Sequence, residues 1–137
     1  MSILVIAEHD NNNLKGATLN TVSAAISLTG NVNLLVIGSN VDSVVEESQS
    51  LDGVNKVIKC DDDIYVNPIA EDLSDIIETL SNGYTHILAP ATTFGKNLMP
   101  RIAAKLDTQQ ISDIISIESD DTFKRPIYAG SCIATVK

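Results

Sequence analysis

The sequence has few of the residues on which several common classes of protein depend. It contains no tryptophan, two cysteines and four prolines, and aromatic residues make up only 4% of its 137 residues. Cys60 and Cys132 are far apart, match no zinc or redox spacing, and lie in apolar runs where a reduced cysteine acts as a small hydrophobic residue. Neither a disulfide framework nor a zinc site is expected.

Basic residues are also scarce. Nine Lys and Arg stand against 18 Asp and Glu, a formal charge of −9, and such a surface repels nucleic-acid phosphates. No apolar run approaches the roughly 20 residues that a membrane span needs. The strand-like "ILVIA" follows Met1 almost at once, which indicates no leader peptide and predicts a protein that is cytosolic or already processed.

Apolar segments typical of strands alternate with helical patterns along most of the chain. The strand-like segments are 3–7, 32–38, 56–60 and 84–91, and the helical ones are 17–28, 44–51, 69–80 and 98–106. In the first helix Leu19, Val22 and Ile26 form the expected buried stripe. In the third helix the expected stripe is longer: Ile69, Leu73, Ile76, Ile77 and Leu80. Pro100 requires the fourth helix to begin close by, within its first turn.

The end of the chain departs from this alternation. Segments 111–118, 125–130 and 132–137 are strand-like with no room for helices between them, so we expect an antiparallel hairpin at the sheet edge. Gly130 and Ser131 would form its turn, and the following side chains would be buried in the sheet: Ile127, Ala129, Cys132, Ile133 and Val136. The predicted fold is an α/β protein, an open and mostly parallel sheet flanked by helices with an antiparallel C-terminal edge.

No linker or repeat divides the chain, so residues 1–137 are expected to form a single domain. The last segment stops in the middle of a strand-like run, which suggests a piece of a longer protein.

The turn at "PATTFGKN", residues 90–97, resembles a phosphate-binding loop. However, Pro90 stands where a Walker loop has its first glycine and Asn97 where it has a hydroxyl. No two glycines are two residues apart, so the dinucleotide fingerprint is absent too. Thr92 and Gly95 still lie between a strand and a helix, a place that suits a ligand or a protein contact as well as simple packing.

Other polar residues follow the strands. His9, flanked by Glu8 and Asp10, could be a general base, although solvated loop residues would look the same. His86 is expected to be a hydrogen-bonded core histidine. The run 61–63 of three aspartates lacks the spacing of a calcium loop and is expected to be a solvated strand end.

Three stretches together resemble the N-terminal domain of electron-transfer flavoprotein alpha subunits. They are "ILVIAEHDNNNLKGATLNTVSAA" at 3–25, "HILAPATTFGKNLMPRIAAKLDTQQISDI" at 86–114 and "FKRPIYAGSCIATVK" at 123–137. The resemblance covers essentially the whole chain. It implies an adenine-nucleotide-hydrolase-like, Rossmann-type sandwich that is followed, in the complete subunit, by a separate FAD-binding domain.

The resemblance also implies a function. The family carries electrons from acyl-CoA and related dehydrogenases, through FAD, to a membrane quinone oxidoreductase, in the bacterial cytoplasm or the mitochondrial matrix. The alpha subunit pairs with a beta subunit of similar fold. Family FAD ligands fall outside this sequence, so this part is expected to be a scaffold and interface domain that has no catalytic residues, metal ligands or bound FAD of its own.

Four residues are the candidates for that interface. Phe94 is one of only two phenylalanines and lies in the predicted loop, with three side-chain donors nearby: Lys96, Asn97 and Arg101. Two other functions remain open on the residues alone. One is a stand-alone adenine-nucleotide-binding module of the universal-stress-protein type, and the other is a small hydrolase using His9 with Asp10.

Overall fold

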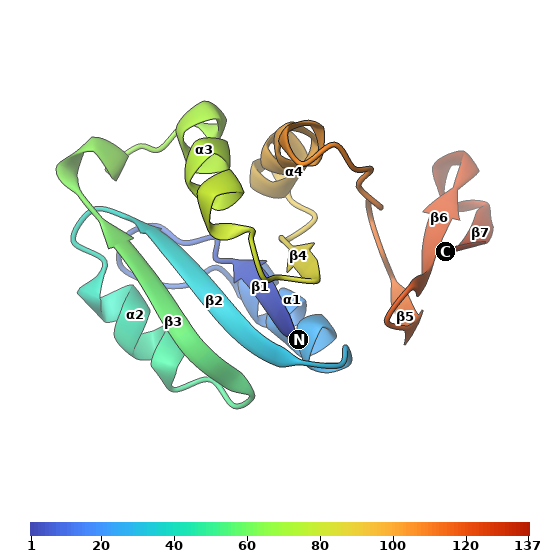
Figure 1. The fold of residues 1–137 in the computed structure, drawn as a ribbon, viewed down its shortest axis with the longest axis horizontal. Coiled ribbons are helices and arrows are strands. Elements are labelled where there is room, and N and C mark those ends of the chain that lie inside the picture. Colours follow the sequence, from blue (N-terminus) through green and yellow to red (C-terminus); the bar gives the residue numbers. More distant parts are fainter.

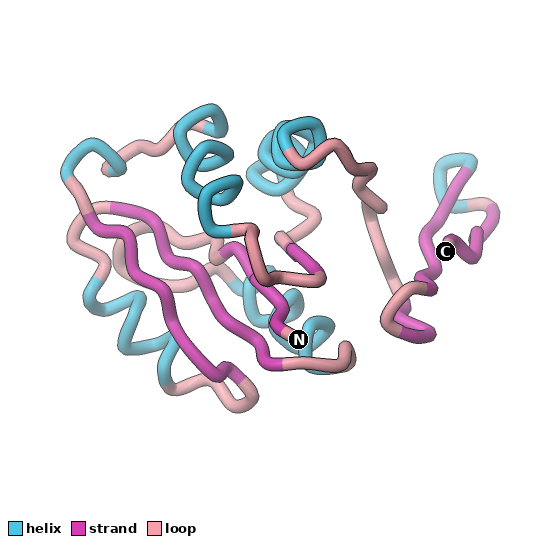
Figure 2. Tube along the Cα trace, in the orientation of Figure 1, coloured by secondary structure: helices cyan, strands magenta, loops and turns pink.

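The computed structural model describes all 137 residues. The chain forms a four-stranded sheet covered by helices, followed by a smaller sheet (Figures 1 and 2). Its first part consists of β1 (Ser2–Ile6), α1 (Gly16–Ile26), β2 (Asn31–Gly38), α2 (Asp42–Gln49), β3 (Val54–Asp61), the short 3₁₀ helix η1 (Asp63–Tyr65), α3 (Ala70–Leu80), β4 (His86–Leu88) and α4 (Thr93–Lys105). None of these helices is both long and apolar enough to cross a lipid bilayer.

The four-stranded sheet is entirely parallel, in the order β3-β2-β1-β4. Helices α1 and α2 cover one face, and α3 and α4 cover the other (Figure 1). Central strand β1 contributes to both cores: Ile3 and Val5 pack under α1 and α2, while Leu4 and Ile6 pack under α3 and α4. A strand buried on both faces must be apolar at every position, which explains the unbroken aliphatic run. The predicted parallel α/β sheet is confirmed.

The order of the strands determines where the surface loops meet. The chain builds outward from β1 to β3 and then returns to place β4 on the other side of β1. The connections that leave β1 and β4 therefore go to opposite faces, into α1 and α4. This divergence is the switch point at which open α/β sheets commonly form a crevice.

Helix α1 buries a different stripe from the one predicted. Its inward face is formed by Thr18, Thr21, Val22 and Ala25, whereas Leu19 and Ile26 are 41% and 48% exposed. Small inward side chains let the helix lie close to the sheet. The threonine hydroxyls can be buried because each has a hydrogen-bond partner; that of Thr21 donates to the Ala17 carbonyl.

The prediction for Pro100 was also wrong. Helix α4 begins at Thr93, so Pro100 lies well inside it instead of in its first turn. Pro100 cannot donate to the carbonyl of Lys96 one turn earlier. Both residues are exposed, so the missing bond falls on the solvent side of the helix, where water can reach the carbonyl.

The last three strands do not join the parallel sheet. Strands β5 (Ser116–Ser119), β6 (Thr122–Ile127) and β7 (Cys132–Val136) form an antiparallel sheet of their own, in the order β5-β6-β7, which we call the arm (Figure 1). The turn between β6 and β7 is the short helix η2 (Tyr128–Gly130), which ends at Ser131, so the predicted pairing and turn are confirmed. The prediction that these strands lie at the edge of the parallel sheet was wrong, because they form a separate sheet.

Because the last strands form a separate sheet, the side chains of residues 127–136 that were predicted to be buried are not. Ala129, Cys132 and Ile133 are exposed, and Ile127 and Val136 are only half-buried. No helix layer covers the arm, so side chains at its far end have nothing to pack against within the chain (Figure 1).

The near end of the arm is fixed to the parallel sheet. At the turn between β5 and β6, the Asp120 carboxylate accepts a 2.8 Å hydrogen bond from the Thr29 amide, and His86 Nε2 lies 2.6 Å from the Asp120 carbonyl oxygen. Phe123 on β6 belongs to the core beneath α1, and Ile117 packs against that core. His86 is hydrogen-bonded as predicted, but half-buried at this joint.

Candidate functional site

The switch point brings the loops after β1 and β4 into direct contact. The Thr92 hydroxyl donates a 3.0 Å hydrogen bond to Glu8 Oε1 and accepts one of 3.5 Å from the Gly95 amide, capping α4. Buried Thr18 holds the backbone of Glu8: its hydroxyl oxygen lies 2.9 Å from both the Glu8 nitrogen and carbonyl oxygen. The first turn of α4 therefore already faces a carboxylate of the protein.

These residues do not fit a nucleotide phosphate or the pyrophosphate of FAD. An anion at the N-terminus of α4 would meet the negative charge of Glu8. The small size of Gly95 has a packing explanation, because a Cβ atom there would lie only 1.8 Å from the Pro90 carbonyl oxygen. Gly95 thus allows the helix to approach the preceding loop, and no ligand is needed to account for it.

His9 is engaged through both of its ring nitrogens. Nε2 lies 2.8 Å from the Ile37 carbonyl oxygen and donates to it, while Nδ1 accepts a 2.9 Å bond from the Asn11 amide. Gly38 makes room for this arrangement, since a Cβ there would lie 2.7 Å from the ring. His9 is therefore a neutral histidine that ties the β1 loop to β2, and the hydrolase hypothesis loses its general base.

Burial lowers the pKa of His9 below its ordinary value, although the Ile37 carbonyl and Asp10 oppose the shift. The unfolded chain then binds more protons than the folded one below about pH 6.5, so the stability contributed by neutral His9 is lost as the pH falls from there toward the folded-state pKa. We expect His9→Gln to remove this contribution, which has a slope of at most about 1.4 kcal/mol per pH unit. Denaturant unfolding at pH 7.5 and 5.5 measures it; parallel pH profiles for the variant and the wild type would contradict it.

The aspartate run after β3 caps neighbouring elements. Asp61 accepts hydrogen bonds from the Asn40 and Val41 amides at the start of α2, which hold its pKa below its usual range. Asp62 accepts one from the Ile64 amide and caps η1. The three aspartates are exposed, as predicted for a solvated strand end.

The four interface candidates all lie on α4, but the structure does not gather them into one cluster. Phe94 is half-buried against the core beneath α3 and α4, so it has a local packing role that the sequence did not reveal. Lys96 pairs with Asp113 at 3.3 Å on the side of the arm, while Arg101 pairs with Glu71 of α3 at 2.9 Å. Asn97 is exposed.

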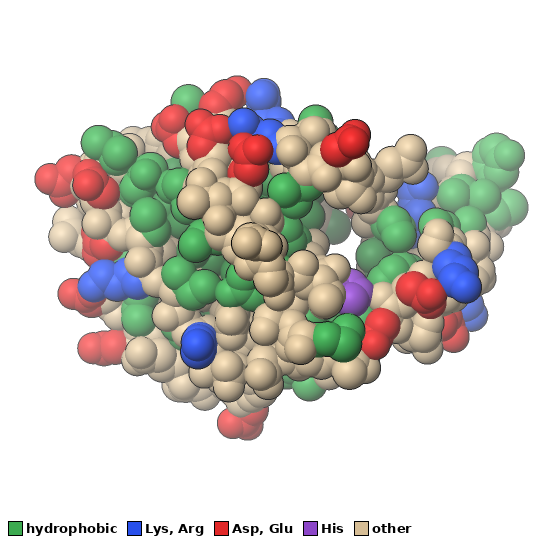
Figure 3. All heavy atoms as spheres, in the orientation of Figure 1, with side chains coloured by type: hydrophobic (Ala, Val, Ile, Leu, Met, Phe, Trp, Pro, Cys, Tyr) green, Lys and Arg blue, Asp and Glu red, His purple; other side chains and the backbone are tan.

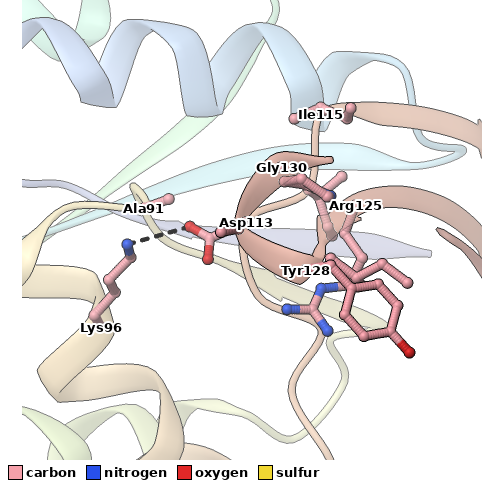
Figure 4. A pocket seen from close by; sticks show the side chains of 11 residues that line it. Ala91, Lys96, Asp113, Ile115, Arg125, Tyr128 and Gly130 are labelled. Carbon is pink, nitrogen blue, oxygen red and sulfur yellow. Dashed lines mark ion pairs between the residues drawn. The ribbon is translucent and has the colours of Figure 1, made fainter. Parts of the chain in front are cut away.

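A hollow of about 700 Å³ lies between the first turn of α4 and the arm (Figure 4). We call it the arm hollow. Ala91 and Lys96 line one wall, the segment 113–115 connects the two sides, and residues 125–130 form the other wall. Sequence reasoning missed this site because its two walls are far apart in the chain and meet only through the placement of the arm.

Large apolar side chains are exposed around the arm hollow and the far end of the arm. Ile115 is 59% exposed, Tyr128 78% and Ile133 62%. Hydrophobic side chains gather over this end of the molecule in Figure 3. Tyr128 and Ala129 have φ angles of 51° and 54°, a backbone conformation that non-glycine residues seldom adopt, so the turn holds its tyrosine outward at some cost in strain.

Comparison with known proteins agrees with this architecture. Residues 3–137 match the model of the electron transfer flavoprotein domain. The chain is 52% identical over its whole length to the electron transfer flavoprotein subunit alpha of Pseudomonas aeruginosa, of which it covers 44%. It is 44% identical over 98% of its length to the mitochondrial alpha subunit of Dictyostelium discoideum, covering 40% of that protein, and 40% identical over its whole length to the alpha subunit of Paracoccus denitrificans, covering 44%.

The chain thus spans less than half of the length of these curated relatives. The family match nevertheless includes both the parallel sheet and the arm, and the relatives are alpha subunits from bacteria and from a eukaryote. On this ground the chain belongs to the electron transfer flavoprotein family.

Proposed function

We propose that residues 1–137 are a single scaffold and interface domain at the N-terminus of the alpha subunit of a heterodimeric, FAD-containing electron carrier. The carrier takes electrons from acyl-CoA and related dehydrogenases and passes them to the respiratory chain, in the bacterial cytoplasm or the mitochondrial matrix. The domain performs no catalysis itself. Its role is to hold the beta subunit in place beside the rest of the alpha subunit, where FAD binds.

One observation carries this proposal: the far end of the arm exposes large apolar side chains. Tyr128 and Ile133 of the arm and Ile115, just before β5, are all more than half exposed, and Tyr128 and Ile115 line the arm hollow. Contiguous exposed apolar surface on a folded protein commonly marks a protein contact, and aromatic anchors dominate such contacts. The beta subunit is the partner that the family supplies for this surface, and Lys96 and Asn97 on α4 lie on the solvent side of the nearby helix.

The switch point also supports the scaffold role, because its residues do not suit a nucleotide. A nucleotide carrier or a stress-protein-like module would need an anion site where Glu8 meets Thr92. This chain places a carboxylate there and packs Gly95 against Pro90. FAD therefore belongs, in this proposal, to a part of the longer subunit outside these residues.

The test is direct association with the beta subunit of the source organism. We expect the chain to form a 1:1 complex on size-exclusion chromatography and Tyr128→Ala to weaken it roughly tenfold or more, since it removes the aromatic side chain that the arm exposes. Ile64→Ala is the matched control, because Ile64 is also 70% exposed but lies in η1, at the opposite end of the molecule from the arm (Figure 1). The affinity of the Ile64→Ala variant for the beta subunit should equal that of the wild type.

Calorimetric titration with ATP and, separately, with FAD completes this test. No heat of binding is expected from either ligand. Saturable ATP binding, together with no complex formation, would overturn the proposal in favour of a nucleotide-binding module. Purification of the chain with stoichiometric flavin would also overturn the assignment of FAD to another part of the subunit.

A further inference from the structure

The turn that joins α3 to β4 contains an Asn-Gly pair that has no part in the proposed function. Asn82 and Gly83 lie between the two elements, and both are exposed. The Tyr84 amide donates a 3.1 Å hydrogen bond to the Ser81 carbonyl, so Asn82 and Gly83 are the central residues of a β-turn (Figure 1). Gly83 has a φ angle of 92°, a conformation that glycine adopts freely.

An Asn-Gly pair deamidates through its own backbone. The amide nitrogen of the glycine attacks the side-chain carbonyl carbon of the asparagine. The new N–C bond closes a succinimide ring, and the side-chain nitrogen leaves as ammonia, with the proton that the backbone amide gave up. Water then opens the ring at either of its carbonyl groups, which gives aspartate or isoaspartate. The net reaction is hydrolysis of a side-chain amide, so water is its only co-reactant.

This attack requires a backbone amide that is not held by a hydrogen bond. The Gly83 amide donates to no atom of the chain, and it lies outside both α3 and β4. The space around the residue is also open, because a Cβ atom on Gly83 would meet no heavy atom within 4 Å. The amide nitrogen of Gly83 is therefore free to approach the side chain of Asn82.

The asparagines in the loops after β1 and β2 are protected, because the amide that follows each of them is already bonded. In every case the acceptor is a carboxylate oxygen 2.7 to 3.1 Å away: Asp10 for the Asn12 and Asn13 amides, Glu47 for the Leu14 amide and Asp61 for the Val41 amide. A nitrogen held in this way must first lose its hydrogen bond before it attacks.

The remaining asparagines are protected by their place in the chain. Asn67 precedes Pro68, whose nitrogen carries no hydrogen. The others lie inside helices or strands, where the backbone rotation that closes the ring is opposed by the regular structure: Asn20, Asn31, Asn33, Asn55 and Asn97. Asn82 thus differs from every other asparagine of the chain.

We propose that Asn82 is a site of spontaneous covalent modification, at which this protein deamidates as it ages. The inference does not depend on the beta subunit or on the proposed function. The isoaspartate product lengthens the backbone of the α3–β4 turn by one atom, and both products place a new negative charge beside the C-terminal end of α3.

The longer backbone acts on a buried polar pair next to the turn. The hydroxyl of Tyr84 accepts a 2.9 Å hydrogen bond from Asn33 Nδ2 on β2. Asn33 is only 7% exposed, and its Oδ1 atom has no hydrogen-bond partner. When isoaspartate displaces Tyr84, the side chain of Asn33 loses its one partner, and a buried polar group without a partner destabilises the fold.

Peptide mapping of the aged chain tests the site. The folded chain is incubated in a neutral and in a mildly alkaline buffer, digested with trypsin and analysed by mass spectrometry. Cleavage after Lys59 and Lys96 releases residues 60–96, in which Asn67 is an internal control. We expect Asn82 to be converted at least about fivefold faster than any other asparagine, roughly the factor for opening one hydrogen bond. The alkaline buffer should accelerate the reaction, because the attacking nitrogen must lose a proton. An unmodified Asn82, or conversion spread evenly over the asparagines, would refute the site.

The variant Asn13→Gly supplies a matched control. It creates a second exposed Asn-Gly pair, after Asn12, at an amide that donates to Asp10. In the folded variant Asn12 should be converted about fivefold more slowly than Asn82, since its neighbouring amide is held. In guanidinium chloride the two rates should become equal. Equal rates in the folded variant would mean that the dipeptide alone decides, and would overturn the structural argument for Asn82.

Melting midpoints test the effect on the fold. Asn82→Asp adds the same charge as deamidation without lengthening the backbone, so it should melt within about 2 °C of the wild type. The isoaspartate form, purified from aged chain by ion exchange, should melt about 3 to 6 °C below the wild type. An isoaspartate form that melts together with Asn82→Asp would refute the link from the turn to Asn33.

Discussion

Replacing Gly95 by alanine is expected to destabilise the fold by about 3 kcal/mol or more, at the severe end for a single added methyl group. The new Cβ would lie 1.8 Å from the Pro90 carbonyl oxygen, a distance that no side-chain rotation can relieve because the opposing atom belongs to the backbone. Pro90 is buried, so either its loop or the first turn of α4 must move. Either movement would also disturb the contact between Thr92 and Glu8.

The control is Gly16→Ala. Gly16 is the first residue of α1, and a Cβ there would meet no heavy atom within 4 Å. Alanine in that position is expected to be neutral or stabilising by up to about 1 kcal/mol. Urea unfolding of both variants gives the two free energies. If Gly95→Ala unfolded at the same urea concentration as Gly16→Ala, the packing account of Gly95 would be wrong, and a ligand role for the glycine would have to be considered again.

The parallel sheet and its order of elements could be predicted because the pattern there is local. Aliphatic runs such as 3–7 and 32–38 can be buried on both faces only in a helix-covered sheet. Most of the predicted α3 stripe, with Leu73 and Ile77 at its centre, faces the core, whereas Ile69 precedes the helix and is 55% exposed. The buried stripe of α1 was predicted wrongly because the large aliphatic side chains of the helix were expected to face the sheet, whereas the smaller ones do. Thr18 and Thr21 are the residues buried there, and their hydroxyls find partners that the sequence does not show.

The arm could not be placed from the sequence, and the candidate site depended on that placement. The strands after α4 carry the same apolar residues whether they add to the parallel sheet or pair among themselves. Contacts remote in sequence decide between the two: Asp120 with Thr29, and His86 with Asp120. For the same reason the sequence did not identify Arg125 and Tyr128 as residues of the arm hollow. Phe94, which the sequence did single out, packs locally against the core.

The switch point shows why a motif needs its spatial context. Hydroxyl and glycine residues between a strand and a helix are what a phosphate loop uses, and residues 92–95 supply them. The structure uses the hydroxyl of Thr92 to cap α4 and to bind Glu8, and it uses Gly95 for close packing. The same residue types thus account for the turn without a ligand.

The attachment of the arm leads to the second large prediction. Phe123 is only 9% exposed and is the member of β6 that enters the core beneath α1, together with residues of β1 and β2. Phe123→Ala should therefore cost about 3 to 5 kcal/mol, a large share of a total stability of roughly 5 to 15 kcal/mol. For a chain of this length, the melting midpoint should fall by about 10 to 20 °C.

Two further variants separate the near end of the arm from its far end. Ile133→Ala, in β7, should change the stability by no more than about 0.5 kcal/mol, because Ile133 is 62% exposed. Truncation after Asp121 removes both residues and should lower the midpoint at least as far as Phe123→Ala does, since it also unpairs β5. Circular dichroism melts of the three proteins provide the comparison. An unchanged midpoint after truncation would mean that the arm is a linker and that its contact with the core adds nothing to the fold. A loss in Ile133→Ala equal to that in Phe123→Ala would mean that the exposed end of the arm, on which the proposed interface depends, is in fact packed within the chain.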